Sequence, residues 1–286
     1  MIINKITPQG YCNGVKRAIN MVLNILNDSS TPKPIYLLGS VIHNKFVNNE
    51  FINKGAIILD DTNKTRLELL DQISSGTVVI SAHGASPKVF EKAKNKGLNI
   101  IDTTCPNVNI IHNNITSHLN DGYTCLYIGS KKHPECEGVL EINSSIINIE
   151  NIDDIDNLSI TNKNIYATNQ TTLSLLDTIN IYDKLQMKYP NIKIDNKICD
   201  STTKRQLAVL NQEKVDLCII VGDKKSSNTQ KLAKLSLEMG IKTLLVESIF
   251  DLNNYDFKDI NRVSITSGAS TPSILVDEII NFLDNK

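Results

Sequence analysis

The feature of this sequence that most constrains its fold is an internal repeat marked by three cysteines. Cys12, Cys105 and Cys199 lie 93 and 94 residues apart, and a helical pattern follows each of them. A strand pattern ending in a polar loop comes next, and a second such loop comes before the following cysteine. The sequence therefore predicts three copies of one α/β unit.

Short apolar runs alternate with helical patterns along the whole chain, which is typical of parallel strands joined by crossover helices. We expect strands at residues 35–38, 56–59, 77–81, 99–102, 124–128, 146–149, 164–167, 193–198, 217–221, 243–246 and 262–266. We expect helices at residues 15–26, 87–96, 173–188, 203–212, 229–239 and 272–283. The predicted class is α/β, with three pseudo-repeated lobes that each contain a small, mostly parallel sheet flanked by helices.

The repeat also predicts where the lobes begin and end, at residues 8–100, 101–195 and 196–286. In the first two lobes a strand runs into the next cysteine, but the third lobe has no strand after its last helix. We therefore expect residues 1–7, with a strand at 2–6, to complete the third sheet and cover an exposed edge. The alternative is that residues 2–6 pair with the first lobe, the commoner choice for consecutive elements.

Polar side chains gather in the loops that follow the predicted strands. Ligands of open α/β sheets bind beyond the carboxyl ends of strands, so three such edges around one axis would make a single central site. Neutral donors at helix N-termini suit the oxygens of a phosphate, which predicts an anionic ligand. The donors are His43, His83, His133, Thr171, Ser226, Ser227, Asn228 and Ser270.

Glu135 is a carboxylate in the loop of His133. It is a candidate general acid if burial raises its pKa. The alternatives are a solvated glutamate and, for each histidine, a hydrogen-bonded structural residue.

The three repeated cysteines predict a metal cluster. They cannot all pair into disulfides with one another, and the paired Cys-x-x-Cys ligands of zinc sites are absent from the sequence. Iron-sulfur clusters normally take four cysteines, so three imply an iron with an open position. The alternative is that they are buried core thiols. We interpret Cys125 and Cys218, in the middle of predicted strands, in that way.

Composition disfavours two classes of partner. The formal net charge is −1, from 30 basic and 31 acidic residues spread along the chain, which gives no footprint for nucleic acid or an anionic membrane. No stretch approaches the roughly 20 apolar residues that cross a bilayer, and no targeting leader is visible. We expect a cytoplasmic protein.

Eight short motifs together carry a family resemblance. They are Tyr11-Cys12-Asn13-Gly14-Val15, His43-Asn44, Ser81-Ala82-His83-Gly84, Asp102-Thr103-Thr104-Cys105-Pro106, His133-Pro134-Glu135-Cys136-Glu137-Gly138, Gln170-Thr171-Thr172, Ser226-Ser227-Asn228 and Ser267-Gly268-Ala269-Ser270. This combination resembles the 4-hydroxy-3-methylbut-2-enyl diphosphate reductase family. The resemblance implies the terminal step of the methylerythritol phosphate route to isoprenoids. In that step, reductive dehydroxylation of (E)-4-hydroxy-3-methylbut-2-enyl diphosphate gives isopentenyl and dimethylallyl diphosphates.

The resemblance also implies roles for particular residues. Cys12, Cys105 and Cys199 are expected to hold one 4Fe-4S cluster with an open iron for the substrate hydroxyl. Glu135 with Thr171 is expected to pass the proton that lets water leave. His133 is the remaining member of the expected catalytic set. The diphosphate is expected to bind His43, His83, His133, Thr171, Ser226, Ser227, Asn228 and Ser270.

The source of electrons is expected to be a separate protein. The sequence contains no Gly-rich dinucleotide fingerprint, so a ferredoxin or flavodoxin is the expected donor. Two rival classes share the cysteines: an iron-sulfur hydro-lyase acting without net redox, and a non-catalytic electron carrier. A hydro-lyase would turn over without reductant, and a carrier has no reason to gather polar loops around its cluster.

Overall fold

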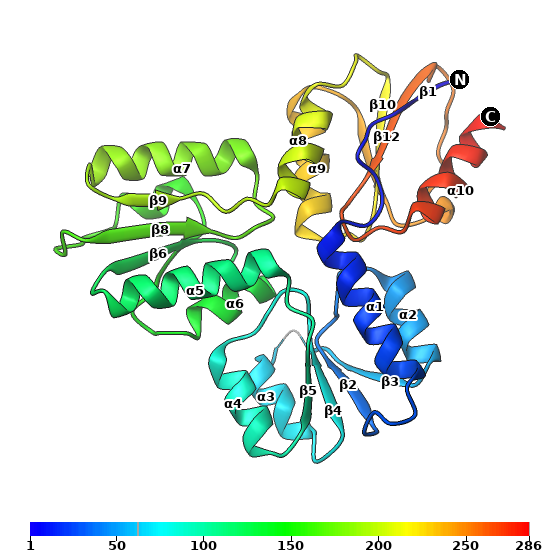
Figure 1. Cartoon of the computed structure of the whole chain (residues 1–286). Coiled ribbons are helices and arrows are strands. Elements are labelled where there is room, and N and C mark those ends of the chain that lie inside the picture. Colours follow the sequence, from blue (N-terminus) through cyan, green and yellow to red (C-terminus); the bar gives the residue numbers. More distant parts are fainter. Residues whose placement is uncertain (62, 286) are drawn as a thin grey trace. The chain divides into compact units, whose positions relative to one another are not determined.

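The computed structural model describes residues 1–61 and 63–285, which form three four-stranded sheets flanked by helices (Figure 1). Every strand pair in these described sheets is parallel, as expected for strands joined by crossover helices. The predicted α/β class is confirmed. None of the described helices is long and apolar enough to cross a membrane.

The first sheet has the order β3-β2-β4-β5. Its strands are β2 (Ile35–Leu38), β3 (Ala56–Leu59), β4 (Thr77–Ile80) and β5 (Asn99–Asp102). The helical segments of this part of the chain are α1 (Asn13–Asn27), α2 (Lys45–Asn53), α3 (Arg66–Leu69), η1 (Leu70–Gln72) and α4 (Pro87–Asn95). All four residues of β4 are buried, which explains its uninterrupted apolar character after Thr77.

The second sheet repeats this topology in the order β7-β6-β8-β9. Its strands are β6 (Thr124–Ile128), β7 (Ile147–Ile149), β8 (Ile165–Asn169) and β9 (Lys193–Asp195). Its helical segments are α5 (Pro106–Asn120), α6 (Pro134–Leu140), η2 (Ile152–Ile155) and α7 (Leu175–Lys188). Consecutive residues of β6 face opposite sides of the sheet and belong to different cores. Tyr127 packs in a cluster with Ile111 of α5, and Leu126 packs in a cluster with Leu185 of α7.

The third sheet has the order β1-β12-β10-β11 and joins the two ends of the chain. Its strands are β1 (Ile2–Lys5), β10 (Leu217–Val221), β11 (Thr243–Val246) and β12 (Arg262–Ser267). Its helical segments are α8 (Asp200–Leu210), α9 (Ser227–Glu238), η3 (Ile249–Leu252) and α10 (Ser273–Asp284). Ile2 lies opposite Arg262 in the parallel pairing of β1 with β12. Strand β1 therefore completes this sheet, as the repeat predicts, and not the first sheet.

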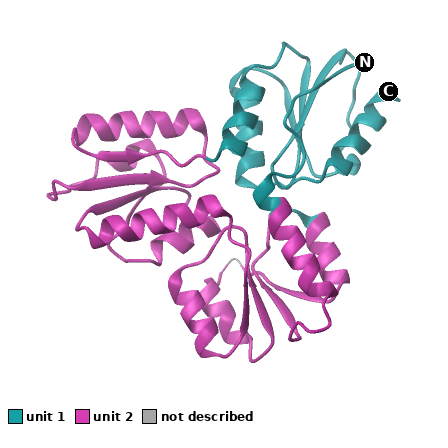
Figure 2. Ribbon diagram, viewed as in Figure 1, with its two compact units in different colours: residues 1–15, 43–45, 199–286 teal, residues 16–42, 46–198 magenta. Residues whose placement is uncertain are grey.

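The described chain forms two compact units (Figure 2). One comprises Met1–Val15, His43–Lys45 and Cys199–Lys286 and contains the third sheet. The other comprises Lys16–Ile42 and Phe46–Ile198 and contains the first two sheets. The lobe boundaries at 8–100, 101–195 and 196–286 remain predictions.

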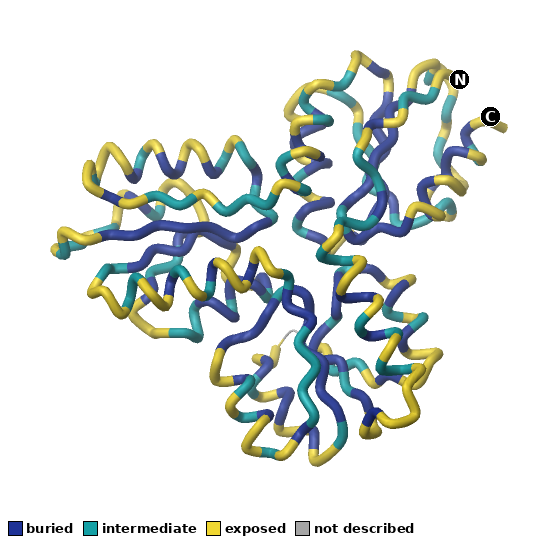
Figure 3. The backbone as a smooth tube through the Cα atoms, viewed as in Figure 1, coloured by how far each residue is buried: buried dark blue, intermediate teal, exposed yellow. Residues whose placement is uncertain are grey.

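Burial follows the layers of each sheet. Figure 3 shows the central strands buried and the outward faces of the helices exposed. Leu37, Val79 and Ile219, from β2, β4 and β10, have no exposed surface. The central parallel strands are therefore covered on both faces, which removes apolar side chains from water and stabilises each sheet.

The short helix α6 is absent from the sequence-based prediction, which places Glu135 in a loop. In the structure His133 caps this helix and Pro134 occupies its first turn. Proline suits that position because the missing N–H would have no intrahelical partner there. The helix has only seven residues and includes Gly138, so its sequence carries little helical periodicity.

Candidate active site

The predicted site residues lie just beyond the carboxyl ends of the strands, as expected for this class of sheet. His83 follows β4, Glu135 follows β6 and Thr171 follows β8 in the unit with two sheets. In the other unit, Ser226 and Ser270 follow β10 and β12. The predicted site residues therefore fall into two groups, one in each compact unit.

Glu135 is the buried carboxyl group of the first group, with 1% of its surface exposed. The backbone amide of Thr171 donates to Oε1 at 2.8 Å, and the Thr171 hydroxyl donates to Oε2 at 2.9 Å. The Tyr127 hydroxyl also donates to Oε1, at 3.2 Å. Both carboxyl oxygens are thus fixed by neighbours from β6 and the loop after β8.

Burial raises the pKa of Glu135 to about 7, although the hydrogen bonds from Thr171 and Tyr127 act in the opposite direction. Burial disfavours the charged carboxylate, whereas donors that point at it favour the charge. The pKa of Tyr127 is raised well above its usual value, chiefly by burial, so this phenol remains a neutral donor. A carboxyl group with a pKa near 7 can give up a proton at neutral pH, as a general acid must.

His133 positions the start of α6. Its Nδ1 accepts a hydrogen bond from the backbone amide of Glu135 at 3.2 Å, so a neutral His133 ring carries its proton on Nε2. The ring lies edge-on to His83, with 5.4 Å between the ring centroids. Two predicted phosphate ligands from different sheets are therefore neighbours within this unit.

Gly129, at the end of β6, allows the loops to pack closely beside this carboxyl group. A Cβ at this position would lie 2.8 Å from Cε1 of Tyr127 and 3.3 Å from the Gln170 side chain. Gln170 in turn accepts a hydrogen bond from the Ser130 amide at 3.1 Å. A larger residue at position 129 would displace Tyr127, which is one of the donors to Glu135.

Part of the second group lies at the N-terminus of α9. Ser226 caps this helix and accepts from the Thr229 amide at 3.4 Å. Asn228 is 4% exposed, and neither polar atom of its side chain has a hydrogen-bond partner in the described part of the chain. The Ser270 hydroxyl donates to the backbone carbonyl of His43 at 3.0 Å, which brings these two predicted residues together. An unpaired buried amide at a helix N-terminus is suited to an anion.

The six cysteines divide into two kinds. Cys125, Cys136 and Cys218 have no exposed surface and pack in apolar clusters. Cys12, Cys105 and Cys199 are partly exposed and free of disulfides. Cys105 and Cys199 are the N-cap residues of α5 and α8, and the Sγ atom of Cys12 accepts from the Val15 amide at 3.5 Å. Backbone amides at helix starts favour a negatively charged ligand such as a thiolate.

Two arginines that the sequence analysis did not single out support the cysteine segments. Arg205, on the helix after Cys199, is 3% exposed and donates to the Gly10 carbonyl at 2.6 Å, two residues before Cys12. Burial lowers the pKa of Arg205, whereas the nearby Cys12 and Cys199 thiols raise it. The guanidinium is therefore a buried cation close to two of the three thiols.

Arg17, on the helix after Cys12, plays the corresponding part in the other unit. It donates to the carbonyl of Thr104 at 3.0 Å and that of Thr103 at 3.4 Å, directly before Cys105. In both cases an arginine from one cysteine's helix holds the segment that leads to another cysteine. The sequence signal would have been an arginine five or six residues after a repeated cysteine.

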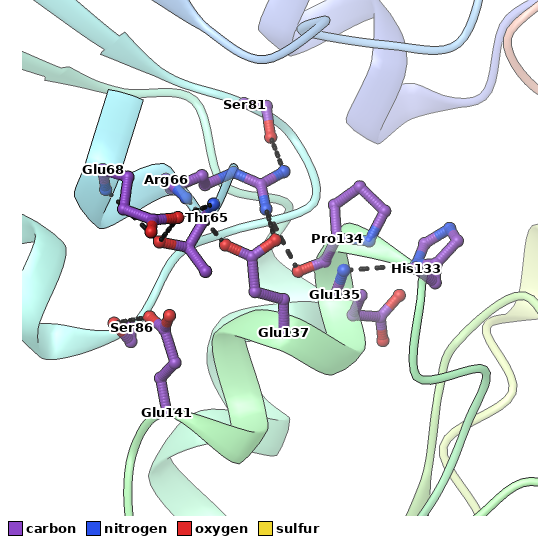
Figure 4. A network of polar contacts seen from close by, with 10 residues as sticks. All are labelled: Thr65, Arg66, Glu68, Ser81, Ser86, His133, Pro134, Glu135, Glu137 and Glu141. Atoms are coloured by element: carbon purple, nitrogen blue, oxygen red, sulfur yellow. Dashed lines mark hydrogen bonds and ion pairs between the residues drawn. The ribbon is translucent and has the colours of Figure 1, made fainter. Parts of the chain in front are cut away.

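A further polar network ties α6 to α3 and also went unnoticed in the sequence (Figure 4). Its centre is an ion pair between Arg66 and Glu137, with 3.1 Å between Nη1 and Oε2. Glu137 accepts from the backbone amide of Arg66 as well, at 2.9 Å. The two residues are 71 positions apart, so no local pattern could have indicated the pair.

Comparison with known proteins identifies the family. The family described as "LytB protein" matches residues 3–284. A protein from Geobacillus kaustophilus (strain HTA426) named 4-hydroxy-3-methylbut-2-enyl diphosphate reductase is 45% identical over 99% of this chain and 90% of its own length. A protein of the same name from Lysinibacillus sphaericus (strain C3-41) is 42% identical over 99% of this chain and 88% of its own length.

Solved structures agree with this match. The E-1-hydroxy-2-methyl-but-2-enyl-4-diphosphate reductase from Plasmodium falciparum superposes with a TM-score of 0.92 at 34% identity, covering 99% of this chain and 88% of that one. A structure titled as (E)-4-hydroxy-3-methyl-but-2-enyl diphosphate reductase, the terminal enzyme of the non-mevalonate pathway, has a TM-score of 0.69 at 29% identity, with both chains fully covered. The resemblance carried by the sequence motifs is confirmed, and the chain belongs to the LytB protein family.

Proposed function

We propose that this chain reduces (E)-4-hydroxy-3-methylbut-2-enyl diphosphate to isopentenyl and dimethylallyl diphosphates. The reaction consumes two electrons and two protons, breaks the allylic C–O bond and releases the oxygen as water. The family match supports this assignment, since the relatives named above are reductases of this diphosphate. The observation within the molecule that carries it is the buried Glu135 carboxyl group beside His133.

Glu135 is the proposed general acid. Its carboxyl group is neutral for much of the time at pH 7, because burial raises its pKa to about 7. After it donates a proton to the leaving hydroxyl, the resulting carboxylate has three donors in place, from Thr171 and Tyr127. These donors stabilise the charge without rearrangement, which lowers the cost of the transfer. We assign Thr171 and His133 to the same catalytic set.

The remaining polar residues are proposed to hold the diphosphate. The buried amide of Asn228 supports this role, because its polar atoms have no partner among the described residues. Ser226 and Ser227 start the same helix, and its N-terminal amides favour phosphate oxygens. The proposed ligands of the diphosphate are His43, His83, His133, Thr171, Ser226, Ser227, Asn228 and Ser270.

Cys12, Cys105 and Cys199 are proposed to hold one 4Fe-4S cluster with an open iron site. The donor set fits that group, because these thiols are partly exposed and free of disulfides while the other three are buried in cores. When bound, the cluster would supply the electrons and a Lewis-acid position for the allylic hydroxyl. A ferredoxin or flavodoxin is the proposed donor of electrons, and a cytoplasmic location remains a prediction.

Turnover of anaerobically purified protein, with and without reduced ferredoxin, tests the proposed function. We expect both products in the presence of reduced ferredoxin and none in its absence. Turnover without any reductant would contradict the proposal and indicate a hydro-lyase. Absence of product under both conditions, with the cluster intact and flavodoxin also supplied, would contradict the reductase assignment.

A further inference from the structure

Arg66 is a buried cation that the proposed reaction does not use. Its side chain is 6% exposed, although it lies at the first turn of a short helix whose capping box, Thr65 with Glu68, faces solvent. Burial lowers the pKa of Arg66, while Glu137, Asp60 and Glu141 raise it. A cation is rarely buried unless its partners hold it in a defined geometry.

The guanidinium contacts two segments that carry predicted phosphate ligands (Figure 4). On one side, Nη2 donates to the Ser81 hydroxyl at 3.5 Å, two residues before His83. On the other side, Nη1 donates to Glu137 at 3.1 Å and to the carbonyl of Pro134 at 3.5 Å, next to His133. One side chain thus links the loop after β4 to the start of α6.

Helix α6 is held from two sides. Glu135 and Glu137 are two positions apart, which places them about 200° apart around a helix. Glu135 therefore points to its own sheet, where Thr171 and Tyr127 hold it. Glu137 points to Arg66, and one turn later Glu141 accepts from the Ser86 hydroxyl at 2.6 Å.

The contacts that hold Glu135 are separate from the contacts that hold Glu137, although both residues lie on the same short helix. The hydrogen bonds of Glu135 come from β6 and the loop after β8, and Arg66 touches neither of them. The spacing of His133 and His83, by contrast, depends on how the start of α6 is placed against the loop after β4, and the pair of Arg66 and Glu137 joins these two segments. Loss of the ion pair should shift the two histidines relative to each other and leave the carboxyl group of Glu135 in place.

We propose that Arg66 is a positioning residue that sets the spacing of His83 and His133 for binding of the diphosphate group. This inference rests on the proposed function. Lysine cannot replace this arginine, because a single ammonium group cannot direct separate donors to Ser81 and Glu137 as the planar guanidinium does. Specificity for two phosphates in a row would then depend on a side chain that need not touch the substrate.

The test compares Arg66→Lys and Glu137→Gln with the wild-type protein, all purified anaerobically. We expect KM for the substrate and the dissociation constant of inorganic pyrophosphate to rise roughly tenfold in each variant, because displaced ligands hold the phosphates less well. We expect kcat and its pH profile to stay within about twofold. In the double variant, KM and the dissociation constant of pyrophosphate should rise no further than in the more strongly affected single variant, because both substitutions remove the same interaction.

Lys184→Met is the matched control. Lys184 forms a salt bridge with Asp156 at 2.7 Å in the same compact unit, and its ammonium also donates to the carbonyl of Ile152, so its contacts lie away from Arg66 and from both histidines. This control should leave KM and pyrophosphate binding unchanged. If Arg66→Lys folds poorly, Glu137→Gln still provides the test. The Glu137 side chain is 27% exposed, and glutamine has the same shape without the charge, so this substitution should destabilise the fold less.

Three results would overturn the inference: unchanged KM and pyrophosphate binding in folded variants, a fall in kcat with a displaced pH profile, or loss of thermal stability alone. The second result would mean that Arg66 acts on Glu135. Pyrophosphate binding is measured by calorimetry without turnover, so it tests the inference even if the wild-type protein fails the reductase assay. Failure of the proposed function and failure of this inference are therefore distinguishable.

Discussion

Replacing Tyr127 with phenylalanine should move the alkaline limb of the kcat–pH profile upward. Tyr127 has no exposed surface, and its hydroxyl donates to Glu135 at 3.2 Å. This hydrogen bond stabilises the carboxylate and so lowers the pKa of Glu135, against the larger effect of burial. Its removal leaves the ring packing intact but favours the protonated acid.

The size of the shift follows from the strength of one hydrogen bond to a charged group. Such a bond contributes about 1.5 kcal/mol at the lower end of its range, and about 1.4 kcal/mol corresponds to one pKa unit. The pKa of Glu135 should therefore rise from about 7 by roughly one unit. At pH 8 the protonated fraction would grow from about one tenth to about one half, a gain of about fivefold relative to each enzyme's own maximum.

The assay is kcat measured from pH 6 to pH 9 with saturating substrate and reduced ferredoxin, because kcat reports ionisations in the enzyme–substrate complex. Tyr166→Phe is the matched control. Tyr166 is equally buried, and its hydroxyl donates to Asp195 at 2.9 Å, not to Glu135. An unmoved or downward-shifted limb in the Tyr127 variant, or an equal shift in the control, would show that the Tyr127 hydroxyl does not set the pKa of Glu135.

Three further substitutions test the acid and the cluster ligands. Glu135→Gln should retain pyrophosphate binding but lower turnover by roughly 10²-fold or more, the usual scale for loss of a general acid, and near-normal turnover would exclude Glu135 from that role. Cys105→Ser should abolish the brown chromophore of anaerobically purified protein, whereas Cys218→Ser, in the core of the third sheet, should retain it. A colourless but folded Cys218 variant would contradict the assignment of Cys12, Cys105 and Cys199 as the cluster ligands.

The buried carboxyl group of Glu135 also makes the stability of the folded protein decrease as the pH rises. The pKa of Glu135 in the folded protein is about 7, above its usual value of 4.5. The folded state therefore favours the protonated acid, so this group's favourable contribution is present below pH 4.5 and is lost as the pH rises through 7. At pH 8 the buried carboxylate costs at most about 3.5 kcal/mol, from about 1.4 kcal/mol per pKa unit over about 2.5 units. The cost belongs to a group that the proposed chemistry needs.

The sheets could be predicted because their signals are local and repeated. The bounds of β2, β5, β6 and β10 agree with the prediction, since each strand ends where a polar loop begins. The pairing of β1 with the last sheet followed from counting strands per repeat. A missing strand in one lobe was enough to predict a contact between the ends of the chain.

Only the site residues that lie in recognisable motifs could be predicted from the sequence. Glu135 was found as a carboxylate beside a histidine, but its two supports behave differently in sequence. Thr171 lies in a recognisable polar loop, whereas Tyr127 lies inside a buried strand and looks like core until its hydroxyl is seen to reach the carboxyl group. The roles of Arg66 and Arg205 could not be predicted for another reason. Their partners Glu137 and Gly10 are 71 and 195 residues away in the sequence.

Net reduction of the diphosphate is tested by the balance of electrons and hydrogen in a single reaction. Anaerobic turnover in deuterium oxide with reduced ferredoxin should consume two electrons for each substrate converted. It should place one solvent deuterium on carbon in each isopentenyl or dimethylallyl diphosphate, because the second proton leaves with the hydroxyl as water. Product formed without oxidation of ferredoxin would contradict net reduction of the allylic diphosphate.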